Sequence, residues 1–246
     1  MQSAIQFYTL RALDEPLDRT LDRVAETSLD GVEFGVGEAT SPADIADELA
    51  DRDLQLANLM AGTDDLENPQ SGLLEVCDAL DCDTVVLGYL DASYFESVER
   101  VEETSTMLSE FARTLDEYGL NFHYHNHDHE FGEIGGRTAF DILLESVDER
   151  VGFELDLGWI GTGGDDPYAR LNSLGDRVSS VHVKDMHFET GKFVSLGEGD
   201  LNLDRAIRTA QEQNVEWVIY ENDEPDDPVT ELEHGADRLA DEVKNT

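Results

Sequence analysis

Short apolar runs rich in β-branched residues alternate along the chain with longer segments whose apolar residues recur three and four positions apart. The short runs have the length and the flanking turn residues of β-strands. The longer segments, such as the one with Leu17, Leu21 and Val24, have the period of helices that bury one face. The pattern predicts strands at residues 4–9, 31–36, 54–60, 84–89, 121–126, 152–157, 179–184 and 216–221, with a helical segment after each.

The repetition of a strand followed by a helix indicates the class of fold. Parallel strands joined by helices form a closed barrel or an open sheet, and eight such units in 246 residues favour the barrel. Helix starts are expected at Ser41, which precedes Pro42 at the first helical position, and at Asp204. We therefore expect an α/β protein with the (β/α)8 TIM barrel fold, formed as a single domain by residues 1–246. An open parallel sheet is the alternative.

The acidic composition indicates the kind of environment and argues against two classes of partner. The chain has 57 Asp and Glu but 16 Lys and Arg, a net charge of −41, and the acids are spread over its whole length. Such a surface repels itself at low salt and is screened in concentrated salt. We therefore expect adaptation to a high-salt cytosol. No basic face is visible, so neither nucleic acid nor an anionic membrane is expected as a partner.

The N-terminus favours a cytoplasmic protein, and the two cysteines are compatible with a reducing cytosol. Met1 leads directly into an apolar strand and an acidic helix instead of a signal peptide, and no apolar run is long enough to span a bilayer. Cys77 and Cys82 lie five positions apart, which matches neither a redox pair nor a zinc knuckle. Both are expected to be buried or half-buried thiols. The sequence leaves the oligomeric state open, a homo-oligomer included.

Candidate ligands and proton carriers follow the last four predicted strands. In a barrel of parallel strands, the reacting groups lie where the strands end. Residues 123–130 hold four of the seven histidines and end at Glu130. A histidine cluster alone is a weak signal, because rim histidines are often only hydrogen-bonded. Strand periodicity directs His182 and Lys184 to the same side, and acids end the neighbouring strands at Asp156 and Glu221.

Acids within otherwise apolar strands indicate a bound cation. A carboxylate inside a buried strand is costly unless it is paired or bound to a cation. Asp156 is the better ligand candidate of its strand, whereas Glu154 is expected to lie deeper, beside a neutralising lysine or arginine. Carboxylate oxygens and imidazole nitrogens from consecutive strands suit Mn2+, Mg2+, Co2+ or Zn2+ and not a thiolate-binding ion. The sequence therefore predicts one divalent metal ion at the mouth of the barrel.

The second half of the chain resembles a known family in its motifs. The segments that carry the resemblance are residues 125–131, 154–159, 182–185, 196–200 and 221–225, in the family's order. They resemble the xylose isomerase-like barrel superfamily, and specifically its sugar phosphate isomerase/epimerase and inosose dehydratase members. The first half is similar only in its rhythm of strands and helices.

The resemblance implies a metal site built from Glu, Asp, His and Glu. On this chain the matching positions are Glu130, Asp156, His182 and Glu221. Many relatives end the fifth strand with a glutamate where this chain has His125, so His125 is the alternative first ligand and Glu130 is preferred. The preferred ion is Mn2+, with Mg2+, Co2+ and Zn2+ as alternatives.

The activity that the resemblance implies is isomerisation or epimerisation of a small sugar, sugar phosphate or keto-sugar. Such enzymes remove a proton next to a carbonyl through a metal-stabilised enediolate. Glu221 or His127 is expected to carry the proton. Lys184 is expected to hold a substrate oxygen, to offset carboxylate charge or to transfer a proton itself. Substrate contacts are expected from His125, Asn126, Trp159 and Phe131.

Other functions compete with this interpretation. An inosose dehydratase-type lyase begins with the same proton abstraction. An endonuclease IV-like phosphodiesterase would need further histidine and acid ligands from the early strands, which end without a histidine. A non-catalytic sugar-binding barrel is the third alternative. The glycine-rich segments 161–164 and 196–200 are a weak indication of a phosphate site.

Overall fold

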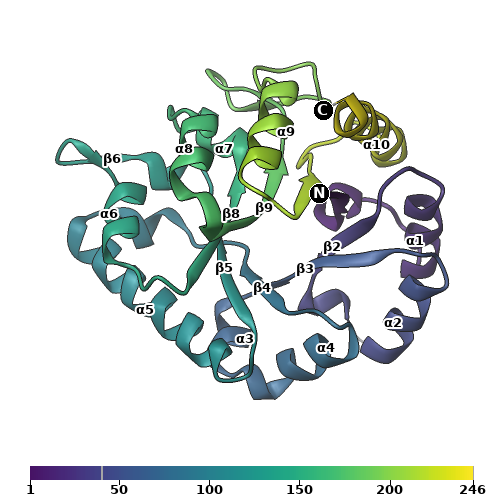
Figure 1. Cartoon of the computed structure of the whole chain (residues 1–246), viewed down its shortest axis with the longest axis horizontal. Helices are drawn as coiled ribbons and strands as arrows, with labels where there is room; N and C mark the ends of the chain where they lie inside the picture. Colours follow the sequence, from purple (N-terminus) through teal and green to yellow (C-terminus); the bar gives the residue numbers. More distant parts are fainter. Residues whose placement is uncertain (40, 246) are drawn as a thin grey trace.

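The computed structural model describes residues 1–39 and 41–245, and its strands form a closed barrel (Figure 1). Neighbouring strands are parallel and follow the order β1-β12-β9-β8-β5-β4-β3-β2. The predicted (β/α)8 barrel is therefore confirmed. The barrel strands are β1 (Gln2–Gln6), β2 (Gly31–Gly35), β3 (Gln55–Ala61), β4 (Thr84–Leu87), β5 (Asn121–His125), β8 (Val151–Asp156), β9 (Val178–Val183) and β12 (Trp217–Tyr220).

The first strand ends earlier than predicted. Residues 7–9 belong to a 3-10 helix, Phe7–Leu10, instead of the strand. The side chain of Gln6 accepts a hydrogen bond from the backbone N–H of Tyr8 at 3.0 Å, which turns the chain away from the sheet. The apolar run of the sequence continues through this turn because Phe7 and Leu10 are buried beside the barrel.

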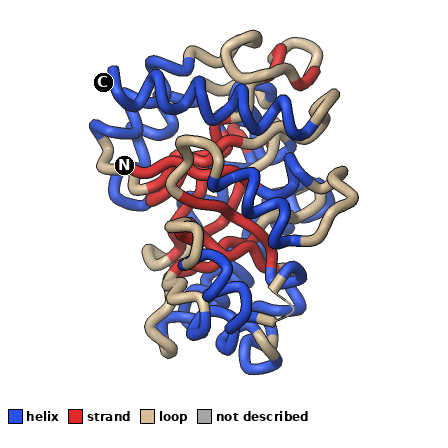
Figure 2. The backbone as a smooth tube through the Cα atoms, turned by 90° about the vertical axis from the view of Figure 1, so that its right-hand side faces the viewer, coloured by secondary structure: helices blue, strands red, loops and turns tan. Residues whose placement is uncertain are grey.

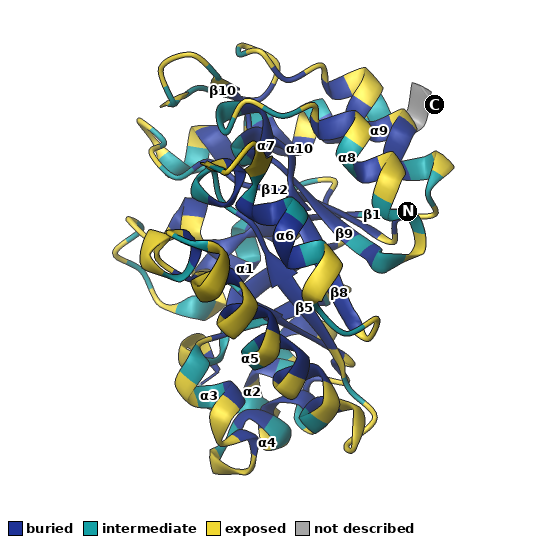
Figure 3. Cartoon of the chain, turned by 90° about the vertical axis from the view of Figure 1, so that its left-hand side faces the viewer, coloured by how far each residue is buried: buried dark blue, intermediate teal, exposed yellow. Residues whose placement is uncertain are grey.

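Helices surround the barrel and each long one buries a single face (Figures 2 and 3). Leu21 and Val24 are fully buried in α1, as their spacing predicts. Among the described residues, no helix is both long enough and apolar enough to cross a membrane. The helices are α1 (Leu17–Ala25), α2 (Pro42–Ala50), α3 (Thr63–Glu67), α4 (Leu73–Ala79), α5 (Val98–Asp116), α6 (Ala139–Ser146), α7 (Leu157–Thr162), α8 (Pro167–Leu174), α9 (Leu203–Glu212) and α10 (Pro228–Asn245).

One of the two predicted helix starts is confirmed. Helix α2 begins at Pro42 with Ser41 before it, although the Ser41 side chain makes no capping hydrogen bond. Helix α9 begins at Leu203, so the prediction of a start at Asp204 is wrong. Asn202 caps this helix, because its side-chain oxygen accepts a hydrogen bond from the Arg205 N–H at 2.9 Å.

The two faces of the barrel strands differ in chemistry. The outward faces carry large apolar side chains that pack under the helices, such as Phe34, Phe122 and Phe153. The inward faces carry a small apolar floor and, above it, polar side chains. The floor is formed by Ala4, Ala57, Trp217 and Ile219. Because strand residues alternate between faces, the polar residues of each strand converge on the barrel axis.

Asp185 fixes the segment that follows β9. Its carboxylate accepts hydrogen bonds from the backbone N–H groups of Gly197 at 2.8 Å, Gly199 at 3.0 Å and Leu201 at 3.1 Å. The two glycine N–H groups are thereby engaged inside the protein. Gly163, in the other glycine-rich segment, packs so closely that a Cβ there would lie 2.7 Å from the Cβ of Phe131. Both segments therefore serve packing in this structure, which removes the basis for a phosphate site there.

Candidate functional site

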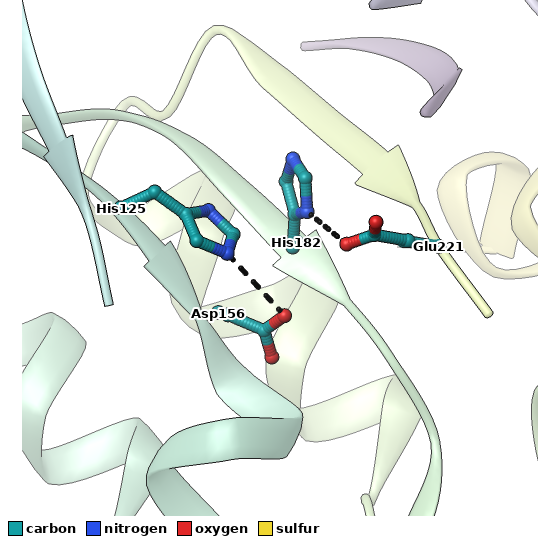
Figure 4. A group of neighbouring side chains, drawn as sticks. All are labelled: His125, Asp156, His182 and Glu221. Carbon is teal, nitrogen blue, oxygen red and sulfur yellow. Dashed lines mark hydrogen bonds and ion pairs between the residues drawn. The ribbon is translucent and has the colours of Figure 1, made fainter. Parts of the chain in front are cut away.

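Four side chains from neighbouring strands converge at the C-terminal mouth of the barrel (Figure 4). They are His125 at the end of β5, Asp156 at the end of β8, His182 in β9 and Glu221 directly after β12. One donor atom of each lies within 4.8 Å of the others. The Nδ1 atom of His182 lies 2.9 Å from Glu221 Oε2, and the Nε2 atom of His125 lies 3.8 Å from Asp156 Oδ2. We call these four residues the upper cluster.

Strand register explains why these residues meet. Strands β5, β8, β9 and β12 are consecutive in the barrel, and Asp156 is the direct neighbour of His182 across the β8–β9 pair. Asn126 adds a further connection between β5 and β8. Its side-chain oxygen accepts from the Asp156 N–H at 3.1 Å and its amide group donates to the Asp156 carbonyl at 3.3 Å. The side chain expected to contact substrate therefore holds Asp156 in place.

Lys184 is buried among the carboxylates of the site. Its Nζ atom lies 3.1 Å from Asp156 Oδ2, 2.9 Å from Glu221 Oε2 and 2.9 Å from Asp223 Oδ1. Burial alone would lower the pKa of Lys184, but the three carboxylates outweigh it and raise that pKa above its usual value. The lysine therefore stays cationic, and it offsets carboxylate charge as the sequence suggested.

The donor set fits a divalent cation. Asp156 Oδ2 is buried and accepts no hydrogen bond, although Lys184 lies beside it. Lys184 is one cation against four carboxylates that are at most 6% exposed. Oxygen and imidazole donors that close together are the ligands of first-row divalent ions. Those four carboxylates belong to Glu33, Glu154, Asp156 and Glu221.

A second layer of carboxylates lies directly under the two imidazoles. Glu33 Oε2 lies 2.7 Å from His182 Nε2. Glu154 Oε1 lies 3.1 Å from both His182 Nε2 and His125 Nδ1. Glu154 thus lies deeper than Asp156, as expected, but histidines accompany it instead of the lysine or arginine that we anticipated. We call Glu33 and Glu154 the lower carboxylates.

Amide and hydroxyl groups hold the lower carboxylates. The Nδ2 atom of Asn58 donates to Glu33 Oε1 at 3.1 Å and to Glu154 Oε2 at 2.7 Å. The hydroxyl of Ser180 donates to Glu154 Oε2 at 2.8 Å, and the amide of Gln6 donates to Glu33 Oε2 at 2.7 Å. Burial and the neighbouring Glu154 raise the pKa of Glu33 to about 8. Burial opposes ionisation of Glu154, but His182 and His125 outweigh it and lower its pKa.

Glu130 lies apart from the upper cluster. It is fully buried, accepts a hydrogen bond from the Tyr124 hydroxyl, and accepts another from the His127 N–H at 3.0 Å. Burial raises the pKa of Glu130, although these bonds oppose that effect. The Glu130 carboxylate therefore holds the turn after β5 closed through its hydrogen bonds to Tyr124 and His127. His125, the alternative first ligand, is the residue that the structure brings together with Asp156, His182 and Glu221.

His127 lies at the cavity wall in a neutral form. Its Nδ1 atom is buried without a hydrogen-bond partner, and burial together with His125 and Lys184 lowers the pKa of His127 to about 2. The exposed ring of Tyr89 meets it edge-on, with 5.0 Å between ring centroids. An imidazole with a pKa this low is a weak base.

The two aromatic residues expected to contact substrate differ in position. Trp159 lies next to the upper cluster, since its backbone N–H donates to Asp156 Oδ1 at 2.9 Å and its ring centroid is 5.7 Å from that of His127. Phe131 is buried and stacks on Phe140 with centroids 5.0 Å apart, so it packs under helix α6. Of this pair, only Trp159 is placed beside the polar site.

A cavity of about 710 Å³ opens above the upper cluster. One wall carries the predicted polar residues, including His125, Lys184 and Glu221. The opposite wall comes from the loops after early strands, which carried no recognisable motif. It includes Phe7, Tyr8, Arg11, Met60 and Tyr89.

Three parts of the candidate site were not identified from the sequence. They are Glu33, Asp223 and the two tyrosines at the cavity rim. Glu33 had a signal of the same kind as Glu154, because it is an acid inside the apolar run 31–36. Tyr8 and Tyr89 are 50% and 59% exposed at the cavity rim. Arg11 lies 3.8 Å from the centroid of the Tyr8 ring and donates to the backbone carbonyl of Asp223.

Comparison with known proteins supports the fold and shows the family. An inosose dehydratase from Clostridium beijerinckii is 24% identical over 152 residues, which cover 53% of this chain and 50% of that protein. The chain spans about half the length of the curated relatives that it matches.

Solved structures extend this similarity over the whole barrel. A sugar phosphate isomerase/epimerase from Parabacteroides distasonis has a TM-score of 0.80 and 18% identity, with 98% of this chain and 94% of that chain covered. The IolI protein, solved with a zinc atom, has a TM-score of 0.79 and 16% identity, with coverages of 100% and 99%. The family described as xylose isomerase-like TIM barrel matches residues 21–242. Because this match extends over most of the sequence, the chain belongs to the xylose isomerase-like TIM barrel family.

Proposed function

We propose that this protein is a divalent-metal-dependent isomerase or epimerase of a small sugar-like substrate. The observation that carries the proposal is the upper cluster, in which His125, Asp156, His182 and Glu221 offer four donor atoms within 4.8 Å of one another, beside a cavity that His125 and Glu221 line. The sugar phosphate isomerase/epimerase fold of similar structures supports the same class of substrate.

The upper cluster would hold the ion through two imidazole nitrogens and two carboxylate oxygens. A divalent cation there supplies Lewis-acid stabilisation of negative charge on substrate oxygens. Taking His125 in place of Glu130 adds a nitrogen donor, and imidazole favours Zn2+ and Co2+ more than carboxylate does. We therefore place Zn2+ and Co2+ beside Mn2+ as the ions to test.

Glu221 is the residue proposed to move the proton. It lines the cavity, and although burial opposes its ionisation, Lys184 and His182 outweigh that effect and lower the pKa of Glu221. An ionised carboxylate at the cavity wall can accept a proton from carbon next to a carbonyl. Lys184 stays cationic beside it and can hold a substrate oxygen. Trp159, Tyr8 and Tyr89 supply apolar surface for a sugar face.

Dehydration of a keto-inositol is the second candidate. It is favoured by the similarity to the inosose dehydratase of Clostridium beijerinckii and by the cationic Lys184, which can donate a hydrogen bond to a leaving hydroxyl. Both reactions begin by removing a carbon-bound proton, so one site can serve either of them.

The test is solvent isotope exchange. Protein loaded with Mn2+, Zn2+ or Co2+ in concentrated KCl is incubated in D2O with a panel of ketoses, their phosphates and inososes, and products are followed by NMR. Deuterium next to the carbonyl with a new epimer or isomer supports the first candidate, and loss of water supports the second. Exchange should vanish in Glu221→Gln and persist in the exposed control Glu216→Gln. No exchange into any substrate with any ion would contradict the proposal.

A further inference from the structure

Each imidazole of the upper cluster is held from below by a carboxylate. His182 directs Nε2 to Glu33 at 2.7 Å and Nδ1 to Glu221 at 2.9 Å. His125 directs Nδ1 to Glu154 at 3.1 Å and Nε2 toward Asp156 at 3.8 Å. In both rings, therefore, one nitrogen faces the lower carboxylates and the other faces the proposed ion.

We propose that Glu33 and Glu154 are positioning residues that fix the ring orientation of His182 and His125. This inference rests on the proposed metal-dependent function. The lower carboxylates engage His182 at Nε2 and His125 at Nδ1, so neither ring can turn over without losing that contact. The opposite nitrogen of each ring therefore faces the upper cluster, and it is the atom available to a metal.

Asn58 couples the two lower carboxylates. Its Nδ2 atom donates to Glu33 and to Glu154, and it also lies 3.0 Å from the Ser180 hydroxyl oxygen. Asn58 is 2% exposed and the two carboxylates are fully buried. Close packing leaves these side chains one arrangement, so the separation of the two carboxylates, and with it that of the two rings, is set before any ligand arrives.

The lower residues could in principle bind a second ion, because Glu33, Glu154 and His182 also offer atoms within 4.8 Å of one another. Their hydrogen-bond partners argue against it. Amide groups of Gln6 and Asn58 donate to both oxygens of Glu33, and Asn58 also donates to Glu154. Donor hydrogens directed at these oxygens occupy the lone pairs that a cation would need. Positioning explains the contacts and a second ion does not.

The first experiment measures metal affinity. Binding of Zn2+ and Co2+ to the full chain in concentrated KCl is measured by competition with a chelating dye, for the wild type, Glu33→Gln, Glu154→Gln and the exposed control Glu216→Gln. We expect one equivalent of metal in all four proteins. Affinity should fall about 10- to 100-fold in the first two variants, as it does when such partners are removed elsewhere, and stay unchanged in the control.

The second experiment observes the rings directly in the Zn2+-loaded protein. Nitrogen-15 NMR of labelled histidine should show His182 bound to the metal through Nδ1 and His125 bound through Nε2. Glu33→Gln should weaken that preference at His182 alone, because a glutamine side chain both donates and accepts.

Three results would overturn the inference. They are unchanged affinity in both glutamine variants, metal bound through the opposite ring nitrogens in the wild type, and two equivalents of metal in the wild type falling to one in Glu33→Gln. If one variant fails to fold by circular dichroism, the other variant and the metal-bound nitrogens of the wild type still decide. Failure of the proposed function itself gives a different result, namely metal bound through the expected nitrogens while no substrate exchanges deuterium.

Discussion

Among the residues that the structure describes, Lys184 is the one lysine or arginine buried inside the acidic site. It contacts Asp156, Glu221 and Asp223, so its removal would leave several carboxylates close together without a counterion. We expect Lys184→Met to lower the free energy of unfolding of the metal-free protein by about 3–5 kcal/mol, the usual cost of leaving buried charges unpaired. Denaturant unfolding in concentrated KCl measures this change.

Metal should recover part of that stability. A cation that binds the folded state stabilises it by mass action, and it compensates the same carboxylates that Lys184 faces. The loss in Lys184→Met should therefore be smaller with saturating Zn2+ than without it. Lys192→Met, at an exposed position, should change little in either condition. If the variant loses the same free energy of unfolding with and without metal, Lys184 and the metal do not compensate the same carboxylates.

The two thiols should be inert in the folded protein. Cys77 and Cys82 are both buried, which confirms the interpretation from their spacing. Burial raises the pKa of Cys77 to about 11 and that of Cys82 to about 12, so neither forms a thiolate near neutral pH. We expect no reaction with a disulfide reagent in the native state and two reactive thiols per chain in guanidinium. Rapid reaction of the native protein would contradict this burial.

The chemistry of single residues predicted part of the site and missed part of it. Asp156, His182 and Glu221 are conspicuous because they interrupt apolar strands, and the structure brings them together. The choice between His125 and Glu130 depends on where the strand ends and how tightly the next turn closes. Hydrophobic periodicity does not contain that information, because both residues are buried.

Helix α7 follows β8 without an intervening loop, so backbone packing there controls the site directly. Asp156 both ends the strand and caps the helix. At Gly158, an added Cβ would lie 2.3 Å from the carbonyl oxygen of Lys184. A contact that short forces α7 away from β9 and displaces Asp156 and Lys184 with it.

We therefore expect Gly158→Ala to lower the free energy of unfolding by about 1–3 kcal/mol, the usual cost of overpacking, and to weaken metal binding. Gly37→Ala is the matched control, because a Cβ at Gly37 would meet nothing within 4 Å. Denaturant unfolding and dye competition measure the two effects. If both variants have the same free energy of unfolding, helix α7 accommodates the added Cβ without loss of stability.

At the scale of elements, hydrophobic periodicity predicted where strands and helices lie better than it predicted where they begin and end. The barrel strands were located because apolar runs and flanking turn residues indicate the same positions. The strand predicted at residues 121–126, for example, corresponds to β5. Features without their own period were not predicted. These are the division of the helical segment after β3 into α3 and α4, and the hairpins formed by β6 (Glu133–Ile134) with β7 (Arg137–Thr138) and by β10 (Met186–His187) with β11 (Lys192–Phe193). Two-residue strands carry no alternation, so only the folded loops define them.

Most of the acidic residues lie at exposed or half-buried positions, and the helices present exposed faces around the barrel (Figure 3). The folded chain exposes 11049 Å² and carries a net charge of −41, about one net negative charge per 270 Å². Most arginines pair with acids at exposed positions, such as Arg100 with Glu103 and Arg208 with Asp204. Pairs of this kind contribute little to stability, so they do not cancel the repulsion.

We propose that this surface is adapted to concentrated salt, and the dependence of stability on salt tests the proposal. The Debye length falls from about 10 Å at 0.1 M to about 3 Å at 1 M, so repulsion between neighbouring acids is largely screened by then. The melting temperature should therefore rise steeply up to about 1 M KCl and more slowly above it. Sucrose, which excludes itself from the surface without screening charge, should not reproduce the steep part.

A charge variant separates screening from other effects of salt. Helix α5 exposes Glu99, Glu102 and Glu110, and their replacement by Gln removes three negative charges without touching the core. If repulsion limits stability, the triple variant melts at a higher temperature than the wild type in dilute salt, and the difference shrinks in concentrated KCl because the removed repulsion is already screened there. A difference that is equal at all salt concentrations, or a wild type whose stability ignores KCl, would show that the acidic surface serves another purpose.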